Sequence, residues 1–208
     1  MTIRVLVADD ETLIRTALSQ LLDLEDDLEV VAQAASGQEA VTQAAHARPD
    51  VAVLDLQMPV PGAADAPDGV AVVEQLAGLL PGCACILVTS HGRPGHLKRA
   101  LAAGARGFLP KTTSASTLAE AIRTVHAGGR HVDPQLATEA ITAGDSPLTP
   151  READVLELAA DGASVEEIAQ RASLSSGTVR NYLSSAVGKL GVSNRHEACA
   201  VARRMGWI

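Results

Sequence analysis

Apolar runs rich in β-branched residues alternate with segments of helical period through residues 1–127 of the chain. We expect five strands where the apolar runs occur: Ile3–Ala8, Leu28–Ala34, Val51–Leu54, Cys85–Thr89 and Gly107–Leu109. Apolarity within these runs is continuous, which is typical of strands covered on both faces. We expect five helices between and after them: Thr12–Leu22, Gln38–His46, Val70–Leu79, His96–Ala103 and Leu118–Ala127. This alternation predicts an α/β doubly wound domain with a five-stranded parallel sheet.

The alternation stops near Gly128, and residues 128–147 are rich in Gly and Pro. We interpret this stretch as an interdomain linker with one short helix, Gln135–Ala143. From Leu148 onward the pattern is helical throughout, and capping-box spacings mark helix starts. Four helices are expected there: Pro150–Ala160, Val165–Arg171, Ser176–Leu190 and Arg195–Met205. The sequence therefore predicts a second, small all-helical domain over residues 148–208.

Charge is distributed unevenly between the two halves. The formal net charge is -8, yet residues 148–208 hold seven basic and seven acidic residues, so the whole excess of negative charge lies on residues 1–147. Beyond Ser173, five basic residues are opposed only by Glu197. An acidic first half and a locally basic end indicate two different tasks. No apolar run approaches the ~20 residues of a membrane span, and the N-terminus lacks signal-peptide features, so we expect a cytoplasmic protein without membrane insertion.

Carboxylates stand at the ends of two predicted strands. Asp9 and Asp10 follow the first strand, and Asp55 ends the third. In a doubly wound sheet of this size these strands are neighbours, and ligands bind at the carboxyl ends of the strands. The three carboxylates should therefore converge, and their mutual repulsion calls for a cation. Oxygen ligands alone, at one open corner, suit Mg²⁺.

Two further strand ends supply hydrogen-bond donors to the same edge. Thr89 closes the fourth strand, and Lys111 lies just past the fifth. A hydroxyl and an ammonium group there can each donate to a phosphoryl oxygen. With a nucleophilic Asp and a metal that shields incoming phosphate, these are the parts needed to phosphorylate a carboxylate. Phe108, three residues before Lys111, could swing inward when Thr89 moves.

The second half has the helix, turn and second-helix order of a helix-turn-helix. Val179 and Leu183 would anchor the second helix, whose outer face would present Thr178, Arg180, Asn181 and Ser184. Arg and Asn side chains read guanine and adenine edges in the major groove, and Lys189 suits a phosphate contact. Because the domain is only weakly basic, useful affinity for double-stranded DNA should need dimers on paired half-sites.

Several segments, taken in order, resemble a known family: VLVADDE, VAVLDLQMP, LVTS, GARGFLPK and the whole C-terminal block. They resemble a response-regulator receiver domain joined to a LuxR-type helix-turn-helix, the NarL/FixJ family, over essentially the whole chain. The resemblance implies that Asp55 is the phosphoacceptor. It implies Mg²⁺ binding by Asp10, Asp55 and the backbone carbonyl of Gln57, with Asp9 assisting largely through water. It also implies a switch pair and a phosphoryl-binding lysine, namely Thr89, Phe108 and Lys111.

The family further implies a transcription regulator switched by a sensor histidine kinase. Phosphorylation would promote homodimerisation through the first and fifth receiver helices, at Leu13, Leu18, Leu118 and Ile122. The segments GRPGHLKRAL and GTVRNYLSSAVGKLGV are most similar to the DesR-type subgroup. The chain departs from the family in the loop Val60–Pro67, which lengthens the connection beside the phosphorylation site.

Two other classes of function are compatible with parts of the sequence. An aspartyl-phosphate enzyme of the hydrolase type would carry a second acid two residues after its nucleophile, but Gln57 stands there, and no Walker A or dinucleotide glycine motif occurs. We therefore do not expect an enzyme. The remaining alternative is a DNA-binding regulator that is independent of phosphate and uses its receiver only for protein interaction.

Overall fold

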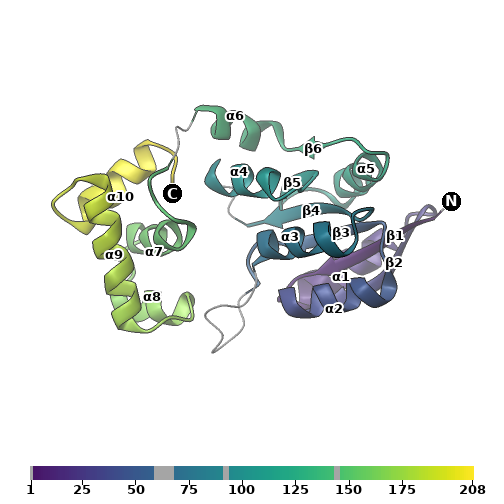
Figure 1. Cartoon of the computed structure of the whole chain (residues 1–208), viewed down its shortest axis with the longest axis horizontal. Helices are drawn as coiled ribbons and strands as arrows, with labels where there is room; N and C mark the ends of the chain where they lie inside the picture. Colours follow the sequence, from purple (N-terminus) through teal and green to yellow (C-terminus); the bar gives the residue numbers. More distant parts are fainter. Residues whose placement is uncertain (1, 59–67, 91–93, 143–145) are drawn as a thin grey trace. The chain divides into compact units, whose positions relative to one another are not determined.

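The computed structural model describes residues 2–58, 68–90, 94–142 and 146–208 of the chain (Figure 1). The chain divides into two compact units. The first contains a β-sheet and extends to Pro134, and the second includes everything from Gln135 to Ile208. The lengthened loop Val60–Pro67 lies outside the described residues.

The first unit is built on a parallel sheet with the strand order β2-β1-β3-β4-β5-β6. Its strands are β1 (Ile3–Ala8), β2 (Leu28–Ala34), β3 (Val51–Asp55), β4 (Ala84–Thr89), β5 (Gly107–Pro110) and β6 (His131–Val132). From β1 the chain adds β2 on one side of the sheet and β3 on the other. The strand order therefore reverses between β1 and β3, which is where doubly wound sheets bind ligands. The predicted fold class is confirmed, and so is the adjacency of the first and third strands, with Ala8 opposite Leu54.

Helices connect the strands at the predicted places: α1 (Thr12–Leu22), α2 (Gly37–Ala47), α3 (Gly69–Leu79), α4 (Pro94–Ala102) and α5 (Ala115–His126). The largest difference in a helix start is at α5, which begins three residues before the predicted Leu118. Ser114 accepts a hydrogen bond from the Thr117 backbone N–H at 3.1 Å and so fixes this earlier start. Apolar periodicity locates the buried stripe of a helix, whereas the capping side chain decides where the helix begins.

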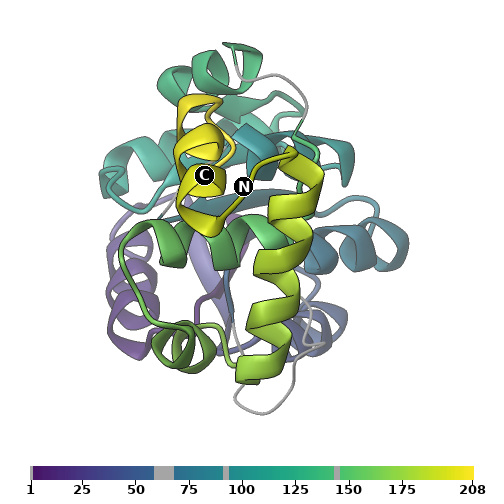
Figure 2. The same ribbon diagram turned by 90° about the vertical axis from the view of Figure 1, so that its left-hand side faces the viewer.

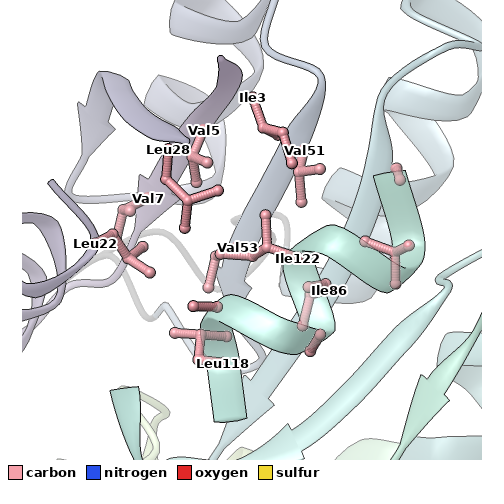
Figure 3. Close-up of a cluster of buried hydrophobic side chains, with 14 of the residues drawn as sticks. Ile3, Val5, Val7, Leu22, Leu28, Val51, Val53, Ile86, Leu118 and Ile122 are labelled. Carbon is pink, nitrogen blue, oxygen red and sulfur yellow. The ribbon is translucent and has the colours of Figure 1, made fainter. Parts of the chain in front are cut away.

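The sheet is apolar on both faces because helices cover both. All residues of β3 and β4 are buried, as the continuous apolar runs predict. On one face, Val5, Val53 and Ile86 pack with Leu22 of α1 and Ile122 of α5 (Figure 3). The parallel strands β1, β3, β4 and β5 end at one edge of the sheet, where Asp9, Asp10 and Asp55 lie.

The short strand β6 corrects the predicted number of strands from five to six. His131 donates its backbone N–H to Arg106 at 2.9 Å, and Asp133 donates to Phe108 at 3.1 Å, so this segment satisfies the outer edge of β5. A strand of two residues leaves no apolar run to detect, and this one follows a Gly-Gly pair. The sheet therefore extends into the stretch that we interpreted as linker.

The second unit is helical in its described part: α6 (Pro134–Thr142), α7 (Pro150–Ala160), α8 (Val165–Arg171), α9 (Ser176–Leu190) and α10 (Arg195–Arg204) (Figure 2). Helices α7 to α9 have the predicted bounds, and α6 begins one residue before the predicted linker helix. Complete capping boxes start α7 at Thr149 and α8 at Ser164. The apolar residues of α7, α8, α9 and α10 form one core around Leu156, Ile168 and Val179. Within the described ranges, none of the helices combines the length and apolarity that crossing a bilayer demands.

Candidate functional site

Three carboxylates converge at the carboxyl edge of the sheet. Asp9 and Asp10 follow β1, and Asp55 is the last residue of the neighbouring strand β3. One ligand oxygen from each lies within 4.8 Å of the others. Asp9 and Asp55 are buried, at 1% and 4% exposure, and Asp10 is the more accessible of the three. The structure thus brings together the acids that the strand ends predict.

Lys111, directly after β5, points its ammonium group into this cluster. Its backbone N–H donates to the Thr89 carbonyl at 2.7 Å, which fixes the residue beside the end of β4. Its Nζ lies 2.8 Å from Asp55 Oδ2 and 2.8 Å from Asp9 Oδ2. A third carboxylate oxygen, Glu11 Oε1, lies 3.1 Å away. The cation that the acids require is therefore supplied in part by the protein itself.

Glu11 is the member of this cluster that sequence reasoning missed. It follows the Asp pair and stands at the N-cap of α1, but its side chain caps nothing there. Its backbone N–H donates to Asp9 Oδ1 at 2.8 Å, while its carboxylate turns towards Lys111. The third acid in the run Asp-Asp-Glu was the available signal.

Burial dominates the electrostatics of Asp55. Burial raises the pKa of Asp55 to about 6, against the lowering effect of the Lys111 hydrogen bond and charge. The pKa of Asp10 is also raised, again chiefly by burial. Burial disfavours the charged form of Lys111, but the carboxylates of Asp55 and Asp9 outweigh it and raise the pKa of Lys111. At neutral pH, Asp55 is consequently an ionised carboxylate with more basic character than an exposed one, as a nucleophile requires.

The donor set suits a hard divalent cation. The three carboxylates offer oxygen atoms only, which is the chemistry that Mg²⁺ prefers. Lys111 approaches Asp9 Oδ2 away from a hydrogen-bonding direction, so this buried oxygen accepts no hydrogen bond from the described residues. Gln57 donates its backbone N–H to Asp55 Oδ1 at 3.3 Å. The expected coordination by the Gln57 carbonyl stays a prediction, because no contact places that oxygen at the cluster.

Gly69 packs directly against the end of β3. It starts α3, and its backbone N–H donates to the Leu56 carbonyl at 3.0 Å. A Cβ at this position would lie 2.3 Å from the Asp55 carbonyl oxygen and 2.7 Å from Leu87 Cδ2. The preceding Asp68 caps α3 through Ala71 and pairs with Arg99 of α4 at 3.1 Å. Only a residue without a side chain lets α3 approach the acceptor strand this closely.

The expected switch residues lie inside the sheet unit. Thr89, the last residue of β4, is buried at 2% exposure, and Phe108 is fully buried at 0%. Phe108 stands opposite Leu87 in the β4–β5 register, whereas Thr89 stands opposite Pro110. The ring of Phe108 is therefore already inward in this structure. A coupled movement of the two side chains stays a prediction.

Helix α9 presents most of the expected DNA contacts to solvent. Arg180, Asn181 and Ser184 are exposed, and buried Val179 and Leu183 anchor the opposite face as predicted. Arg180 Nη2 lies 3.5 Å from Glu166 Oε1 of α8, with both side chains mostly exposed. Thr178 is half-buried, and its hydroxyl lies 2.9 Å from the Ser175 hydroxyl at the N-cap of α9.

Lys189 has a partner within its own unit. Its Nζ donates at 2.8 Å to Glu152, a carboxylate of α7 that is only 4% exposed. Glu152 also accepts from the Ser185 hydroxyl at 2.6 Å and from the Thr149 backbone N–H at 2.6 Å. Sequence reasoning assigned Lys189 to DNA alone and did not predict its pairing with Glu152. A phosphate contact by Lys189 would have to share an ammonium group that already neutralises a buried acid.

The residues proposed for dimerisation divide into two groups. Leu13 on α1 is 82% exposed, and Leu18 is partly buried against the core. Leu118 and Ile122 on α5 are only 3% and 0% exposed because they pack under the sheet. The prediction that Leu118 and Ile122 face a partner subunit is therefore wrong. Helical spacing marks an apolar stripe, but it does not say whether the sheet or another chain covers it.

The fold and site together define a class of protein: a doubly wound α/β domain with an acidic cluster at the carboxyl edge of its sheet, joined to a helix-turn-helix unit. The sequence family described as response regulator receiver domain matches residues 5–123. The family described as bacterial regulatory proteins, luxR family, matches residues 146–202. The first covers the acidic pocket with Lys111, and the second covers α7 to α9 and most of α10.

Relatives match along the whole chain. The transcriptional regulatory protein DesR of Bacillus subtilis is 42% identical over 206 residues, covering 99% of both proteins. The transcriptional regulatory protein UhpA of Escherichia coli is 39% identical over 207 residues, covering 99% of this chain and 100% of UhpA. The crystal structure of the response regulator ChrA, from a heme-sensing two-component system, aligns with a TM-score of 0.56 at 31% identity, covering 100% of this chain and 99% of ChrA. A structure of the RcsB response regulator of Salmonella typhimurium shares the fold with a TM-score of 0.70 at 24% identity, covering 99% of this chain and 98% of RcsB.

The chain belongs to the two-component response regulators that join a receiver domain to a LuxR-type DNA-binding domain. It therefore combines the receiver and the DNA-binding domain of a transcription regulator. The similarity to a DesR-type protein that the sequence suggested is among these matches.

Proposed function

We propose that Asp55 is the residue that accepts the phosphoryl group, and that residues 1–127 and 148–208 act as the receiver and the DNA-binding domain. The observation that carries the proposal is the cluster of Asp9, Asp10 and Asp55 with Lys111 Nζ 2.8 Å from Asp55 Oδ2. Of these acids, Asp55 alone lies within a strand of the sheet, where it stands opposite Val88 of β4 and its carboxylate lies in the cluster.

The proposed reaction conserves all atoms of the phosphoryl group. The donor is a phosphohistidine of a sensor histidine kinase, whose N–P bond breaks as an O–P bond forms on Asp55. The imidazole leaves and takes up a proton. Asp9, Asp10 and Asp55 would hold Mg²⁺, which when bound offsets the negative charge of carboxylates and phosphate. Lys111 can release Asp55 and donate a hydrogen bond to a phosphoryl oxygen without moving its backbone. The Thr89 hydroxyl is expected to donate to another phosphoryl oxygen.

The consequence of phosphorylation is proposed to be homodimerisation and binding of paired DNA half-sites by α9. A single DNA-binding unit carries no net charge, so one copy gains little from phosphate attraction. Two copies on one site add their contacts at a high effective concentration. A DNA target and a soluble kinase domain would place the protein in the cytoplasm.

Covalent labelling tests the assignment of Asp55. Full-length protein should take up a phosphoryl group from acetyl phosphate in the presence of Mg²⁺, with acetate as the leaving group, and chelation of the metal should stop the reaction. Asp55→Ala should take up none. The matched control is Asp50→Ala, because Asp50 lies before the other end of the same strand and should leave labelling intact. Undiminished labelling of Asp55→Ala would remove Asp55 from the role of acceptor.

A further inference from the structure

The ammonium group of Lys111 has carboxylate partners before any phosphate arrives: it donates hydrogen bonds to Asp55 and Glu11 and forms an ion pair with Asp9. It has three N–H bonds and three carboxylate neighbours, at 2.8 Å for Asp9, 2.8 Å for Asp55 and 3.1 Å for Glu11. Two of these neighbours belong to the buried cluster. Glu11 differs from them because its side chain is 57% exposed and supplies no oxygen to the three-acid group.

Phosphorylation changes the demands on Lys111. A phosphoryl group on Asp55 adds negative charge, and Lys111 must turn at least one N–H towards it. Asp55 then loses its own charge to the new bond, while Asp9 and Asp10 belong to the cluster that would hold the cation. Of the three neighbours, Glu11 is the one that neither carries the phosphoryl group nor belongs to the three-acid cluster, and its negative charge stays within hydrogen-bonding reach of Lys111. It therefore competes with the phosphoryl oxygens for the ammonium and repels them at short range.

We propose that Glu11 is a positioning residue that acts through Lys111 and lowers the equilibrium level of phosphorylation. Its carboxylate holds the ammonium in the unphosphorylated arrangement and opposes the phosphorylated one. The inference rests on the proposed function, namely that Asp55 is the acceptor. It concerns the side chain alone, since the link to Asp9 Oδ1 is made by the Glu11 backbone N–H and the start of α1 uses no cap from this carboxylate.

The test compares two variants of equal charge in the full-length protein. Glu11→Gln keeps the length of the side chain and removes its charge. Glu29→Gln removes one charge from an exposed position on β2, opposite Arg4 near the far end of the sheet from the pocket. The measurement is the concentration of beryllofluoride that half-saturates the receiver at saturating Mg²⁺, with Asp55→Ala as the blank. We expect Glu11→Gln to need about two- to fivefold less beryllofluoride, and Glu29→Gln to match the unmodified protein.

A second measurement asks whether the effect passes through Lys111. The chain has three lysines, Lys98, Lys111 and Lys189, so their side-chain ammonium resonances are easily distinguished by NMR. The Lys111 resonance should move in Glu11→Gln and stay in place in Glu29→Gln. Equal half-saturation for the two variants, or an unmoved Lys111 resonance, would overturn the inference while Asp55→Ala still fails to respond. A response that survives in Asp55→Ala would instead defeat the proposed function.

Discussion

Lys189 of α9 donates a hydrogen bond at 2.8 Å to Glu152 of α7, and the carboxylate that accepts it is almost completely buried. The two residues are 37 positions apart in the chain, and Ser185, one turn before Lys189, donates to the same carboxylate. Glu152 thus links the capping box of α7 by hydrogen bonds to α9, the helix that is expected to contact DNA bases. A buried carboxylate is tolerated when paired and hydrogen-bonded in this way.

The first prediction is that Glu152→Gln weakens the DNA-binding unit. The change keeps the shape but removes the charge that Lys189 and the Thr149 N–H require, so the free energy of unfolding should fall by about 1–3 kcal/mol. Trp207 is the only tryptophan and packs against this core, so its fluorescence in urea reports this unit. Asp161→Asn breaks the exposed pair with Arg203 at the other end of α7 and should cost at most ~1 kcal/mol. Equal losses from the two variants would refute a special role for burial.

The second prediction concerns the stability that Glu152 contributes to the DNA-binding unit at low pH. Burial alone would raise the pKa of Glu152, but hydrogen bonds from Lys189, Ser185 and Thr149 outweigh it and lower the pKa from 4.5 to about 2. A carboxylate whose pKa is lower in the folded state stabilises the fold above its unfolded pKa, and this contribution is lost as the pH falls through the folded value. The stability difference between the unmodified protein and Glu152→Gln should therefore be constant at neutral pH and shrink between about pH 5 and pH 2. Trp207 fluorescence at a series of pH values measures it; a pH-independent difference would contradict the prediction.

The third prediction is that Gly69→Ala damages the acceptor strand. The new methyl group would meet the Asp55 carbonyl oxygen at 2.3 Å, so either α3 or the end of β3 must shift. We expect the receiver to lose about 1–3 kcal/mol of stability and to label more slowly with acetyl phosphate. Gly78→Ala on the same helix is the control, because nothing lies within 4 Å of its added Cβ and alanine favours a helix. Circular dichroism in urea and the labelling rate give both readings, and an unaffected Gly69→Ala would show that the packing is looser than described.

These residues show how far sequence alone could reach. The positions of Asp9, Asp10, Asp55 and Lys111 were predictable because strand order brings the ends of parallel strands to one edge. The contacts of Glu11 and Glu152 were not, since each depends on a flexible side chain reaching across to an element distant in the chain.

The burial of apolar helix residues is the second feature that could not be predicted from the sequence. Leu118 and Leu13 carry the same apolar signal, yet one packs under the sheet at 3% exposure and the other is 82% exposed. Only the packed arrangement of α1 and α5 on the sheet separates them. The two-residue strand β6 was missed for a related reason, because its stability comes from pairing with β5 and not from its own residues.

The fourth prediction concerns base reading by α9. Arg180 is exposed, and its ion pair with Glu166, at 3.5 Å between two largely solvated side chains, holds it only weakly. Arg180→Ala should cost about 1–3 kcal/mol at a preferred DNA site and relax specificity there. Selection of binding sequences from a random pool, before and after the change, measures both effects. Glu166→Gln controls for loss of the ion pair and should keep the preference. A uniform loss on all sequences would make Arg180 a phosphate contact.

The last prediction joins the two units through a receiver dimer. Leu13 on α1 is 82% exposed and Leu24, just beyond this helix, is 79% exposed, although both are large apolar residues. When a second receiver covers α1, these side chains lose their contact with water. Each leucine that is buried contributes about 1.5–3 kcal/mol at most to the free energy of dimerisation. A change of only a few kcal/mol is enough to move a monomer–dimer equilibrium. Leu13→Ser should therefore abolish the dimer that beryllofluoride and Mg²⁺ induce, without lowering the free energy of unfolding of the receiver.

Sedimentation of the full-length protein measures this equilibrium. Leu79→Ser is the matched control, because Leu79 ends α3, away from α1, and is 49% exposed. Leu79→Ser should leave dimerisation unchanged. A variant that alters only solubility should also leave it unchanged. If Leu13→Ser still dimerises, α1 is not the interface. If the unmodified protein stays monomeric with beryllofluoride at concentrations where it binds DNA tightly, phosphorylation must act by releasing the DNA-binding unit from the receiver, because affinity would then rise without a second copy.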